Sequence, residues 1–240
     1  MNRGGSIVAE QKTWQPDCLF HPDCMNCIVT AGPTSETLDR VRRLTNFSTG
    51  RLGIELAGFL ADHGHDVTML VGAQASHCGP RRAQRIEIFA TSAELREWLQ
   101  SLANPSVEAV FHVAAVSDFM FGKIWLRSAQ GEISEIKSGK ISSRQGTLLA
   151  ELVPTPKIIA GLRDWFPKAR IVGWKFEVDG NRGDVVRAAE KQISECLTDA
   201  CVGNGPAYGD GFALVLSNGQ LSHLPDAAAL YEALERFARG

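Results

Sequence analysis

The sequence lacks long apolar runs. None of its apolar stretches approaches the roughly 18 residues that a membrane-spanning helix needs. Near the N-terminus, the short apolar stretch that begins at Ser6 is broken by Glu10, whereas a secretory signal peptide requires a continuous apolar core. We therefore predict a cytoplasmic protein that has no membrane partner.

A surplus of charge of one sign is also missing. The 25 Lys and Arg residues nearly balance the 27 Asp and Glu residues, and the formal net charge is -2. The basic residues are scattered, and outside the segment from Cys27 to Gly53 only Arg81-Arg82 forms a pair that resembles a patch. Nucleic-acid-binding domains gather basic residues on one face, so the sequence predicts no nucleic-acid partner.

Cysteine is sparse, with six residues in the chain, and in an intracellular protein we expect reduced thiols rather than disulfides. One cluster, Cys18, His21, Cys24 and Cys27, has a three-residue spacing and soft ligands that suit zinc. Structural zinc sites usually join two separated ligand pairs, however, and Cys27 falls in an expected strand. The alternative, which we favour, is that most of this cluster belongs to an extension that binds no metal.

Alternating apolar and polar segments predict an α/β fold in the first half of the chain. Helices are expected after Gly50 and after Ser92, which is a candidate N-cap. The last strand of this half is almost entirely apolar, as expected for a central strand of a parallel sheet that is covered on both faces. The expected strands are 27–31, 65–71, 85–89 and 108–115.

The second half continues the pattern after an irregular segment. Residues 116–151 are rich in Ser, Gly and Lys and are too long for a simple connection, which is typical of a functional segment or a flap. Beyond it the pattern predicts strands at 169–173 and 199–202, helices at 156–163 with Pro156 in the first turn, 182–197 and 227–238, and a hairpin from 212–216 through Asn218-Gly219 to a strand that begins at Leu221.

These elements predict a Rossmann-like, doubly wound and mainly parallel sheet with helices on both faces, a C-terminal hairpin and a flap segment. Residues 1–24 have no sustained periodicity, and we expect them to form a flexible N-terminal extension. No internal repeat and no linker rich in Pro, Gly or Ser divides the remainder. Residues 25–240 are therefore expected to form a single domain.

The stretch from Cys27 to Gly53 carries the first functional signal. It opens as an apolar strand, breaks at Gly32-Pro33, runs through a polar loop and reaches a turn bracketed by Gly50 and Gly53, directly before a helix. Backbone N–H groups at a helix start are unpaired within the helix, and the macrodipole adds partial positive charge there. The sequence therefore predicts an anion site, and a phosphate suits it well.

Polar residues also collect after the other expected strand ends, where a doubly wound sheet binds its ligands. They include Ser117-Asp118-Phe119, with Lys140 and Lys157 further along the chain. Together with the glycine turn, they offer phosphate-binding amides, a carboxylate for Mg²⁺ and lysines that neutralise the charge of a phosphoryl group. This inventory suits nucleotide-driven activation of a carboxylate.

Several segments in a fixed order resemble one family: AGPTSETLD, VRRLTNFSTGRLG, AAVSDF, GKISS, TPKII and VGWKFEV. Their sequence and order are similar to those of phosphopantothenate–cysteine ligases, and the resemblance spans residues 25 to about 238. It is closest to the free-standing form, which lacks a fused flavin-dependent decarboxylase domain. Several motifs in one order are a strong signal, whereas each alone is weak.

The resemblance implies a two-step ligation of 4'-phosphopantothenate and cysteine that uses CTP or ATP as co-substrate and Mg²⁺. Asn46, in TNFSTG, corresponds to an asparagine that binds the acyl-nucleotidylate, and Lys140, in GKISS, to a lysine needed to turn this intermediate over. Asp118 is the expected Mg²⁺ ligand. The resemblance also implies a substrate- and nucleotide-binding set: Gly32, Ser48, Thr49, Gly50, Gly53, Ala114, Ala115, Asp118, Phe119, Pro156, Lys157, Ile158, Ile159, Trp174 and Lys191.

Some residues depart from the family pattern. Fused bacterial members carry a lysine pair where this sequence has Ser142-Ser143. Family members also tend to carry two lysines on the helix before the last parallel strand, whereas this helix has Lys191 alone, with Glu195 beyond it. The Asn-Asp pair at the end of that strand is Asn204-Gly205 here. The choice between CTP and ATP therefore stays open. The resemblance further implies a homodimer in which residues 120–140 act as a flap, and a separate decarboxylase protein as a partner.

Each assignment has a structural alternative. Asn46 is also a typical turn residue, Asp118 a helix cap and Trp174 a core residue. A nicotinamide-dependent reductase is a second possible function, but the glycines do not form G-x-G-x-x-G after the strand, and neither Tyr208 nor Tyr231 has a lysine four residues later. A non-catalytic relative that binds a nucleotide or a partner is a third.

Overall fold

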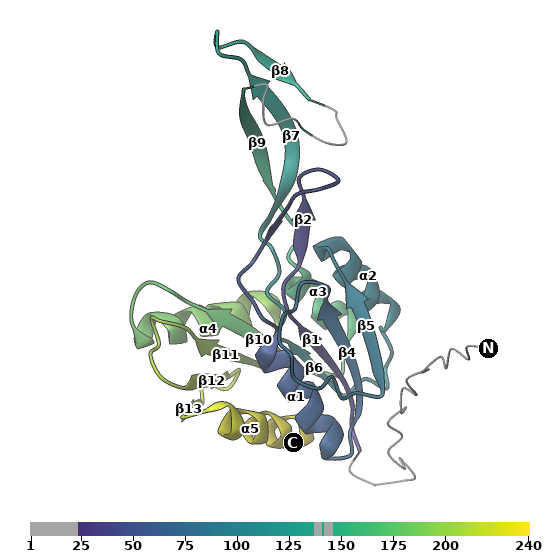
Figure 1. The fold of residues 1–240 in the computed structure, drawn as a ribbon. Coiled ribbons are helices and arrows are strands. Elements are labelled where there is room, and N and C mark those ends of the chain that lie inside the picture. The colour runs from purple at the N-terminus through teal and green to yellow at the C-terminus, as the bar shows by residue number, and fades with distance from the viewer. Residues whose placement is uncertain (1–23, 137–140, 142–145) are drawn as a thin grey trace, which may run out of the picture.

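The computed structural model describes residues 24–136, 141 and 146–240 (Figure 1). The expected extension lies outside the described residues apart from Cys24, and so do Lys140 and Ser142-Ser143. None of the helices within the described ranges combines the length and the apolar character that crossing a bilayer requires.

The centre of the molecule is an eight-stranded, mainly parallel sheet, as the sequence predicted (Figure 1). The six neighbouring strands from β11 to β5 are parallel, whereas β12 runs antiparallel to β11 and β13 antiparallel to β12. Their order in the sheet is β13 (Leu221–Leu224), β12 (Phe212–Leu216), β11 (Ala200–Asn204), β10 (Arg170–Phe176), β6 (Ala109–His112), β1 (Asn26–Ala31), β4 (Asp66–Gly72) and β5 (Arg85–Phe89).

The strand order places a topological switch point between β1 and β6. From β1 the chain moves outward to β4 and β5, and it then returns to form β6 on the other side of β1. The connections that leave the carboxyl ends of β1 and β6 consequently diverge. In open α/β sheets this divergence opens the crevice in which ligands bind.

Helices cover both faces of the sheet because its strands are apolar on both sides. Cys27 and Val29 of β1 face the helices α1 (Arg51–Asp62) and α5 (Ala227–Arg239). Ile28 points to the opposite face, which successive residues of a strand do by geometry, and there it joins the side chains of two other helices. These are α2 (Ser92–Ser101) and α3 (Ile158–Trp165), and α4 (Arg182–Cys196) covers the same face over β11 and β12.

Two predicted helix starts are wrong by one or two residues. The N-cap of α2 is Thr91 rather than Ser92, because the Thr91 hydroxyl accepts a hydrogen bond from the Glu94 N–H at 3.1 Å. Helix α3 begins at Ile158, so Pro156 precedes the helix instead of occupying its first turn. The chain before Pro156 is held extended, since Thr155 Oγ1 donates to the Ser117 carbonyl at 2.5 Å.

The segment that was expected to be irregular forms a second sheet. Strands β7 (Phe119–Arg127), β8 (Ile133–Glu135) and β9 (Thr147–Pro154) pair in the order β8-β7-β9, and this flap sheet projects away from the central sheet in Figure 1. Most of its residues are exposed on both faces. The alternation of apolar and polar residues that marks a half-buried strand is therefore weak here.

A short hairpin replaces the polar loop that we expected between β1 and α1. Strand β2 (Ser35–Thr37) pairs antiparallel with β3 (Arg43–Thr45), and three-residue strands are too short to show a period in the sequence. The base of the hairpin is fixed to the main body. The buried Glu36 carboxylate accepts from the Ser92 N–H at 3.0 Å, and Thr45 Oγ1 donates to the Thr34 carbonyl at 2.9 Å.

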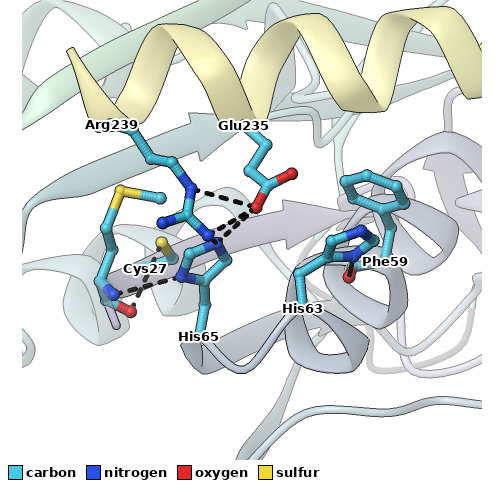
Figure 2. A network of polar contacts seen from close by, with 7 residues as sticks. Cys27, Phe59, His63, His65, Glu235 and Arg239 are labelled. Carbon is cyan, nitrogen blue, oxygen red and sulfur yellow. Dashed lines mark hydrogen bonds and ion pairs between the residues drawn. The ribbon is translucent and has the colours of Figure 1, made fainter. Parts of the chain in front are cut away.

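A polar network closes the amino edge of the sheet (Figure 2). His65, which is fully buried, accepts from the Met25 N–H through Nδ1 at 3.2 Å, so its Nε2 carries the proton and donates to Glu235 of α5 at 3.1 Å. Arg239 donates to the same carboxylate oxygen at 2.9 Å. The network fastens the last helix to the starts of β1 and β4, on the side opposite to the switch point.

Candidate functional site

A cavity of about 940 Å³ opens at the carboxyl edge of the central sheet. Its walls come from the segments that follow β1 and β6, the start of α3, the ends of β10 and β11, and one side of α4. This is the location that the strand order and the predicted polar clusters indicated. A cavity of this size is large enough for a nucleotide together with a second substrate.

The glycine turn forms the wall next to β1. Gly50 is the N-cap of α1 and has a positive φ of 79°, a conformation that glycine adopts without strain. A Cβ atom at Gly53 would lie 2.7 Å from Ala31 Cβ and 2.9 Å from the Thr30 carbonyl oxygen, so glycine is needed for α1 to pass over β1. The first turn of α1, with Arg51, thus presents backbone N–H groups and a guanidinium to the cavity.

Hydrogen bonds join the two segments that diverge at the switch point. The Ala115 N–H donates to the Gly32 carbonyl at 3.0 Å, and the Thr34 N–H donates to the Ala115 carbonyl at 3.1 Å. Strand β6 ends at His112 rather than at Ala115 as predicted, because the Val113 N–H turns back to the Phe111 carbonyl at 3.2 Å, and the pairing resumes in the same register as an isolated parallel bridge between Pro33 and Ala115. The floor of the cavity is consequently built from backbone.

Asn46 lies at the mouth of the cavity, directly after β3. Its side-chain Nδ2 donates to the Ala115 carbonyl at 3.1 Å, across 69 residues of sequence. The side chain therefore bridges two loops and does not close a turn on its own backbone. With Nδ2 held in this way, Oδ1 is oriented by the protein and is available to accept a hydrogen bond from a ligand.

His112 is a cavity residue that the sequence interpretation missed. It ends β6, is buried, and contacts Thr30 Oγ1 through Nδ1 at 3.1 Å, while Thr30 Oγ1 also accepts from the Ala114 N–H at 3.0 Å. Burial lowers the pKa of His112 to about 4, which keeps the imidazole neutral near pH 7. Its position in an apolar run resembled that of a core residue, and no local motif marked it as a cavity residue.

The far end of the cavity holds buried polar atoms that have no partner within the described residues. They are Trp174 Nε1, on β10, and Asn204 Oδ1, at the end of the neighbouring strand β11. An unpaired buried donor or acceptor costs about 1–3 kcal/mol. A donor and an acceptor on adjacent strands of one cavity wall are suited to a ligand that supplies the complementary groups.

Charged side chains of both signs line the cavity. The cations are Arg51, Lys157, Lys175 and Lys191, and the carboxylates are Asp118, Glu177 and Glu195. Lys191 pairs with Glu195 at 3.8 Å, one turn further along α4, and both side chains are exposed. An exposed pair of this kind is weak, so Lys191 keeps the freedom to contact an anionic ligand.

The cavity gathers most of the predicted substrate- and nucleotide-binding set. Gly32 lies behind the glycine turn and Phe119 begins β7, and neither is among the residues that line the cavity. Lys140 lies outside the described residues. The predicted residues that line the cavity are Asn46, Ser48, Thr49, Gly50, Gly53, Ala114, Ala115, Asp118, Pro156, Lys157, Ile158, Ile159, Trp174 and Lys191.

The zinc site that the spacing of Cys18, His21, Cys24 and Cys27 allows gains no support from the described residues. Cys27 is fully buried in the main core, and burial raises the pKa of its thiol well above the usual value, which disfavours the thiolate that zinc requires. Cys18 and His21 lie outside the described residues. Within the described part of the chain, no group of three or more His, Cys, Asp and Glu side chains is arranged to hold a metal ion.

Comparisons with known proteins agree with this architecture. A family model described as the DNA/pantothenate metabolism flavoprotein C-terminal domain matches residues 24–222. The chain is 33% identical over 189 residues to the Coenzyme A biosynthesis bifunctional protein CoaBC of Thermococcus kodakarensis, and the match covers 77% of this chain and 43% of that protein. The chain spans less than half the length of the curated relatives that it matches.

Two solved structures extend the comparison. The DNA/pantothenate metabolism flavoprotein from Streptococcus pneumoniae superposes with a TM-score of 0.76 at 26% identity, covering 89% of this chain and 98% of that one. A Cab2 variant in complex with phosphopantothenate-cysteine has a TM-score of 0.60 at 18% identity, with coverage of 91% and 89%. At 18% identity, the similarity to the Cab2 variant shows a shared fold only.

Proposed function

The chain belongs to the family of DNA/pantothenate metabolism flavoprotein C-terminal domains, and from this premise we propose that it is a phosphopantothenate–cysteine ligase. It joins 4'-phosphopantothenate to cysteine through an acyl-nucleotidylate and gives 4'-phosphopantothenoylcysteine for coenzyme A biosynthesis. The observation that carries the proposal is the cavity at the switch point, which Asn46 lines together with the glycine turn and the ends of β10 and β11. A protein of the same fold binds phosphopantothenate-cysteine.

The first step activates a carboxylate. An oxygen of the 4'-phosphopantothenate carboxylate attacks the α-phosphorus of CTP or ATP, and pyrophosphate leaves. The backbone N–H groups at the start of α1, with Arg51 and Lys157, neutralise charge on the triphosphate. The polar atoms of Trp174 and Asn204 suit the nucleoside at the far end of the cavity.

The second step forms the amide. The amine of cysteine attacks the acyl carbon, the nucleoside monophosphate leaves and the nitrogen loses a proton. Asn46, fixed by its bond to Ala115, accepts through Oδ1 a hydrogen bond from an N–H or O–H group of the phosphopantothenoyl chain and keeps the acyl carbon in line for attack. We assign Lys140 to stabilising the oxyanion in this step, following its place in the GKISS motif.

Mg²⁺ fits this site as an ion carried by the nucleotide. Proteins usually hold Mg²⁺ through one or two carboxylates, with substrate phosphates and water completing the octahedron. Asp118 offers one exposed carboxylate at the cavity, and the described residues contain no group of three or more His, Cys, Asp and Glu side chains arranged to hold a metal ion. When bound, the ion neutralises charge on the triphosphate.

The local structure argues against a nicotinamide-dependent reductase. A dinucleotide site needs its glycine turn immediately after the first strand. Here the hairpin of β2 and β3 lies between β1 and α1, so the segment from Gly32 to Gly50 separates the strand from the helix. The same strand order therefore serves a different phosphate-binding geometry.

A direct assay tests the proposal. The protein is supplied with 4'-phosphopantothenate, cysteine, Mg²⁺ and either CTP or ATP, and pyrophosphate and amide are measured separately. We expect both products, with acyl-nucleotidylate accumulating in the variant Lys140→Ala and not in the control Lys168→Ala. Absence of pyrophosphate with both triphosphates would contradict the ligase and favour a non-catalytic relative, and tight NADPH binding would favour the reductase.

Assembly and location belong to the same proposal. The flap sheet exposes Phe119, Met120, Ile133 and Leu152, whose exposed fractions lie between 41% and 61%. Apolar surface of this kind suits a homodimer in which the flap covers the site of a second copy, and sedimentation equilibrium at micromolar concentration tests it. We place the reaction in the cytoplasm, where a decarboxylase activity consumes the product.

A further inference from the structure

His112 lies on the face of the central sheet that α3 covers. Ile28 of β1 and Val110 of β6 both join the core beneath α2 and α3, as does Ile158, the first residue of α3. Side chains two positions apart on a strand point to the same face, so Thr30 and His112, which are register partners, continue this face at the carboxyl ends of their strands. The His112 ring and the start of α3 therefore meet the cavity from one side of the sheet.

The Thr30 hydroxyl fixes the orientation of the ring and the position of its proton. Thr30 is fully buried, and its Oγ1 accepts from the Ala114 N–H at 3.0 Å and lies 3.1 Å from His112 Nδ1. A buried hydroxyl also needs an acceptor for its own proton, and within the described part of the chain Nδ1 is the acceptor that it contacts. Nδ1 therefore accepts, and the proton of the neutral imidazole is carried by Nε2.

The Nε2–H group of His112 is open to the cavity. It bonds no group among the described residues, and it is not one of their fully enclosed polar atoms. His112 is 5% exposed and lines the cavity, so this nitrogen belongs to the small part of the ring that stays accessible. Burial lowers the pKa of the imidazole to about 4, so the donor is uncharged near pH 7.

Helix α3 adds donors on the same side of the cavity. Its N-cap residue, Lys157, makes no side-chain capping bond, so the N–H groups of Ile158 and Ile159 receive no partner from the cap and have none within the helix. Lys157, Ile158, Ile159 and His112 all line the cavity. A buried neutral donor on the same face as a helix start and a lysine suits an anionic oxygen of a ligand.

The strand order indicates which part of the ligand reaches this wall. Strand β6, which ends at His112, lies between β1 and β10, and β10 carries Trp174. The proposed function assigns the nucleoside to the side of Trp174 and the acyl group to Asn46, whose side chain bonds Ala115 just beyond the end of β6. In an acyl-nucleotidylate the α-phosphate joins the nucleoside to the acyl group. The α-phosphate is therefore expected between the two, at His112.

We propose that His112 is a catalytic residue whose Nε2–H donates to a non-bridging oxygen of the α-phosphate, with Thr30 as the positioning residue that fixes the ring. This inference rests on the proposed function, because it uses the assigned nucleoside and acyl sites. The α-phosphorus is attacked in the first step, and the nucleoside monophosphate leaves with the bonding electron pair in the second. A donor to the α-phosphate stabilises negative charge in both steps, while His112 itself stays neutral and transfers no proton.

Binding of ligand fragments tests the contact without ligase activity. Calorimetry compares CMP, AMP and pyrophosphate on the wild-type protein and on His112→Phe, which keeps a ring and has no donor. We expect the monophosphate that the wild type binds more tightly to bind the variant about tenfold more weakly, whereas pyrophosphate, which contains no α-phosphate, should bind unchanged. Equal weakening of both ligands would overturn the proposal, because general damage to the fold has that effect. Unchanged monophosphate binding, or none in the wild type, would overturn it as well.

Conservative variants separate the donor from the ring. His112→Gln keeps an N–H donor near the position of Nε2 and should bind the monophosphate more tightly than His112→Phe does; equal weakening in the two variants would overturn the proposal. Thr30→Val removes the hydroxyl and keeps the shape, whereas its control Thr30→Ser keeps the hydroxyl. Nitrogen NMR of the ring should show the proton on Nε2 in the wild type and in Thr30→Ser, and both tautomers in Thr30→Val. A proton on Nδ1 in the wild-type protein would contradict the assigned donor.

Single-turnover kinetics test the role in the reaction. In His112→Phe we expect pyrophosphate release and amide formation each to slow by about ten- to a hundredfold, as expected for the loss of a hydrogen bond to a charged group. A loss in amide formation alone would place the ring at the acyl group and overturn the assignment to the α-phosphate. If the wild-type protein formed no pyrophosphate, the ligase assignment and the catalytic role of His112 would fail, while the contact with the phosphate would still be decided by the binding experiment.

Discussion

The two edges of the central sheet each hold a buried histidine, and the surroundings of the two rings differ. At the amino edge, both ring nitrogens of His65 have protein partners, Met25 and Glu235. At the carboxyl edge, His112 contacts Thr30 through one nitrogen, and the residue lines the cavity. One ring closes a structural network, whereas the other belongs to the wall of the cavity.

Other buried polar atoms follow the same division. Within the described residues, the buried side-chain atoms without a partner are Trp174 Nε1, Thr198 Oγ1 and Asn204 Oδ1, and two of these three residues line the cavity. Folded proteins usually pair their buried polar groups, so exceptions call for an explanation. We interpret the amino edge as the part that stabilises the fold and the carboxyl edge as the part that keeps polar atoms available for ligands.

The largest expected effect concerns the amino edge. Replacing His65 with alanine leaves the Met25 N–H without its acceptor and opens a cavity between β4 and α5, so we expect a loss of about 3 kcal/mol in the free energy of unfolding. Urea unfolding measures it. Activity per folded molecule should not change, because the network lies on the side of the sheet opposite to the cavity.

His63→Ala is the matched control for this prediction. His63 is exposed, lies two residues away and bonds the Phe59 carbonyl at 2.8 Å through its ring (Figure 2). We expect its loss to cost less than about 1 kcal/mol. Equal losses in His63→Ala and His65→Ala would contradict the special role of the buried network.

The next effect concerns the carboxyl edge and its pH dependence. Because burial lowers the pKa of His112 from 6.5 to about 4, the unfolded chain binds a proton on this residue more readily than the folded protein does. Stability is therefore unaffected above pH 6.5 and falls as the pH drops from 6.5 towards 4, by about 3 kcal/mol for this residue.

The variant His112→Phe isolates the contribution of His112 to the pH dependence of stability. We expect the free energy of unfolding of the variant to fall less steeply than that of wild type between pH 6.5 and pH 4, with the difference growing to about 3 kcal/mol. Urea unfolding at several pH values measures both slopes. Burial lowers the pKa of His65 as well, so the variant keeps part of the decline, whereas parallel slopes would contradict a neutral, buried His112.

The sequence predicted the framework of the fold better than its additions. Apolar runs such as the one at 108–115 indicated the buried strands, because burial on both faces imposes composition directly. A flap segment was predicted, but its strands and the short hairpin of β2 and β3 were missed, since their residues meet no continuous core and carry little periodicity.

The cavity residues likewise fall into those that the sequence predicted and those that it did not. Gly50 was predicted from a backbone signal, because a glycine turn before a helix has a local signature, whereas Asn46 was assigned through the resemblance of the TNFSTG motif. His112, Gln192 and Asn204 were not among the predicted site residues, although all three line the cavity. Their proximity depends on strand order and on the face of α4, which no local pattern reports.

The smallest expected effect on stability is that of Trp174→Phe at the carboxyl edge, where we expect a change in ligand binding instead of a change in stability. Trp174→Phe removes a buried N–H that has no partner within the described residues, so we expect stability to stay within about 1 kcal/mol or to rise slightly. If Nε1 donates to the bound nucleotide, the KM for the triphosphate should rise about three- to tenfold. The control Trp165→Phe changes a partly buried tryptophan away from the cavity and should leave this KM unchanged. A loss of stability without a change in KM would mean that Trp174 stabilises the fold, as His65 does at the amino edge, and does not contact the nucleotide.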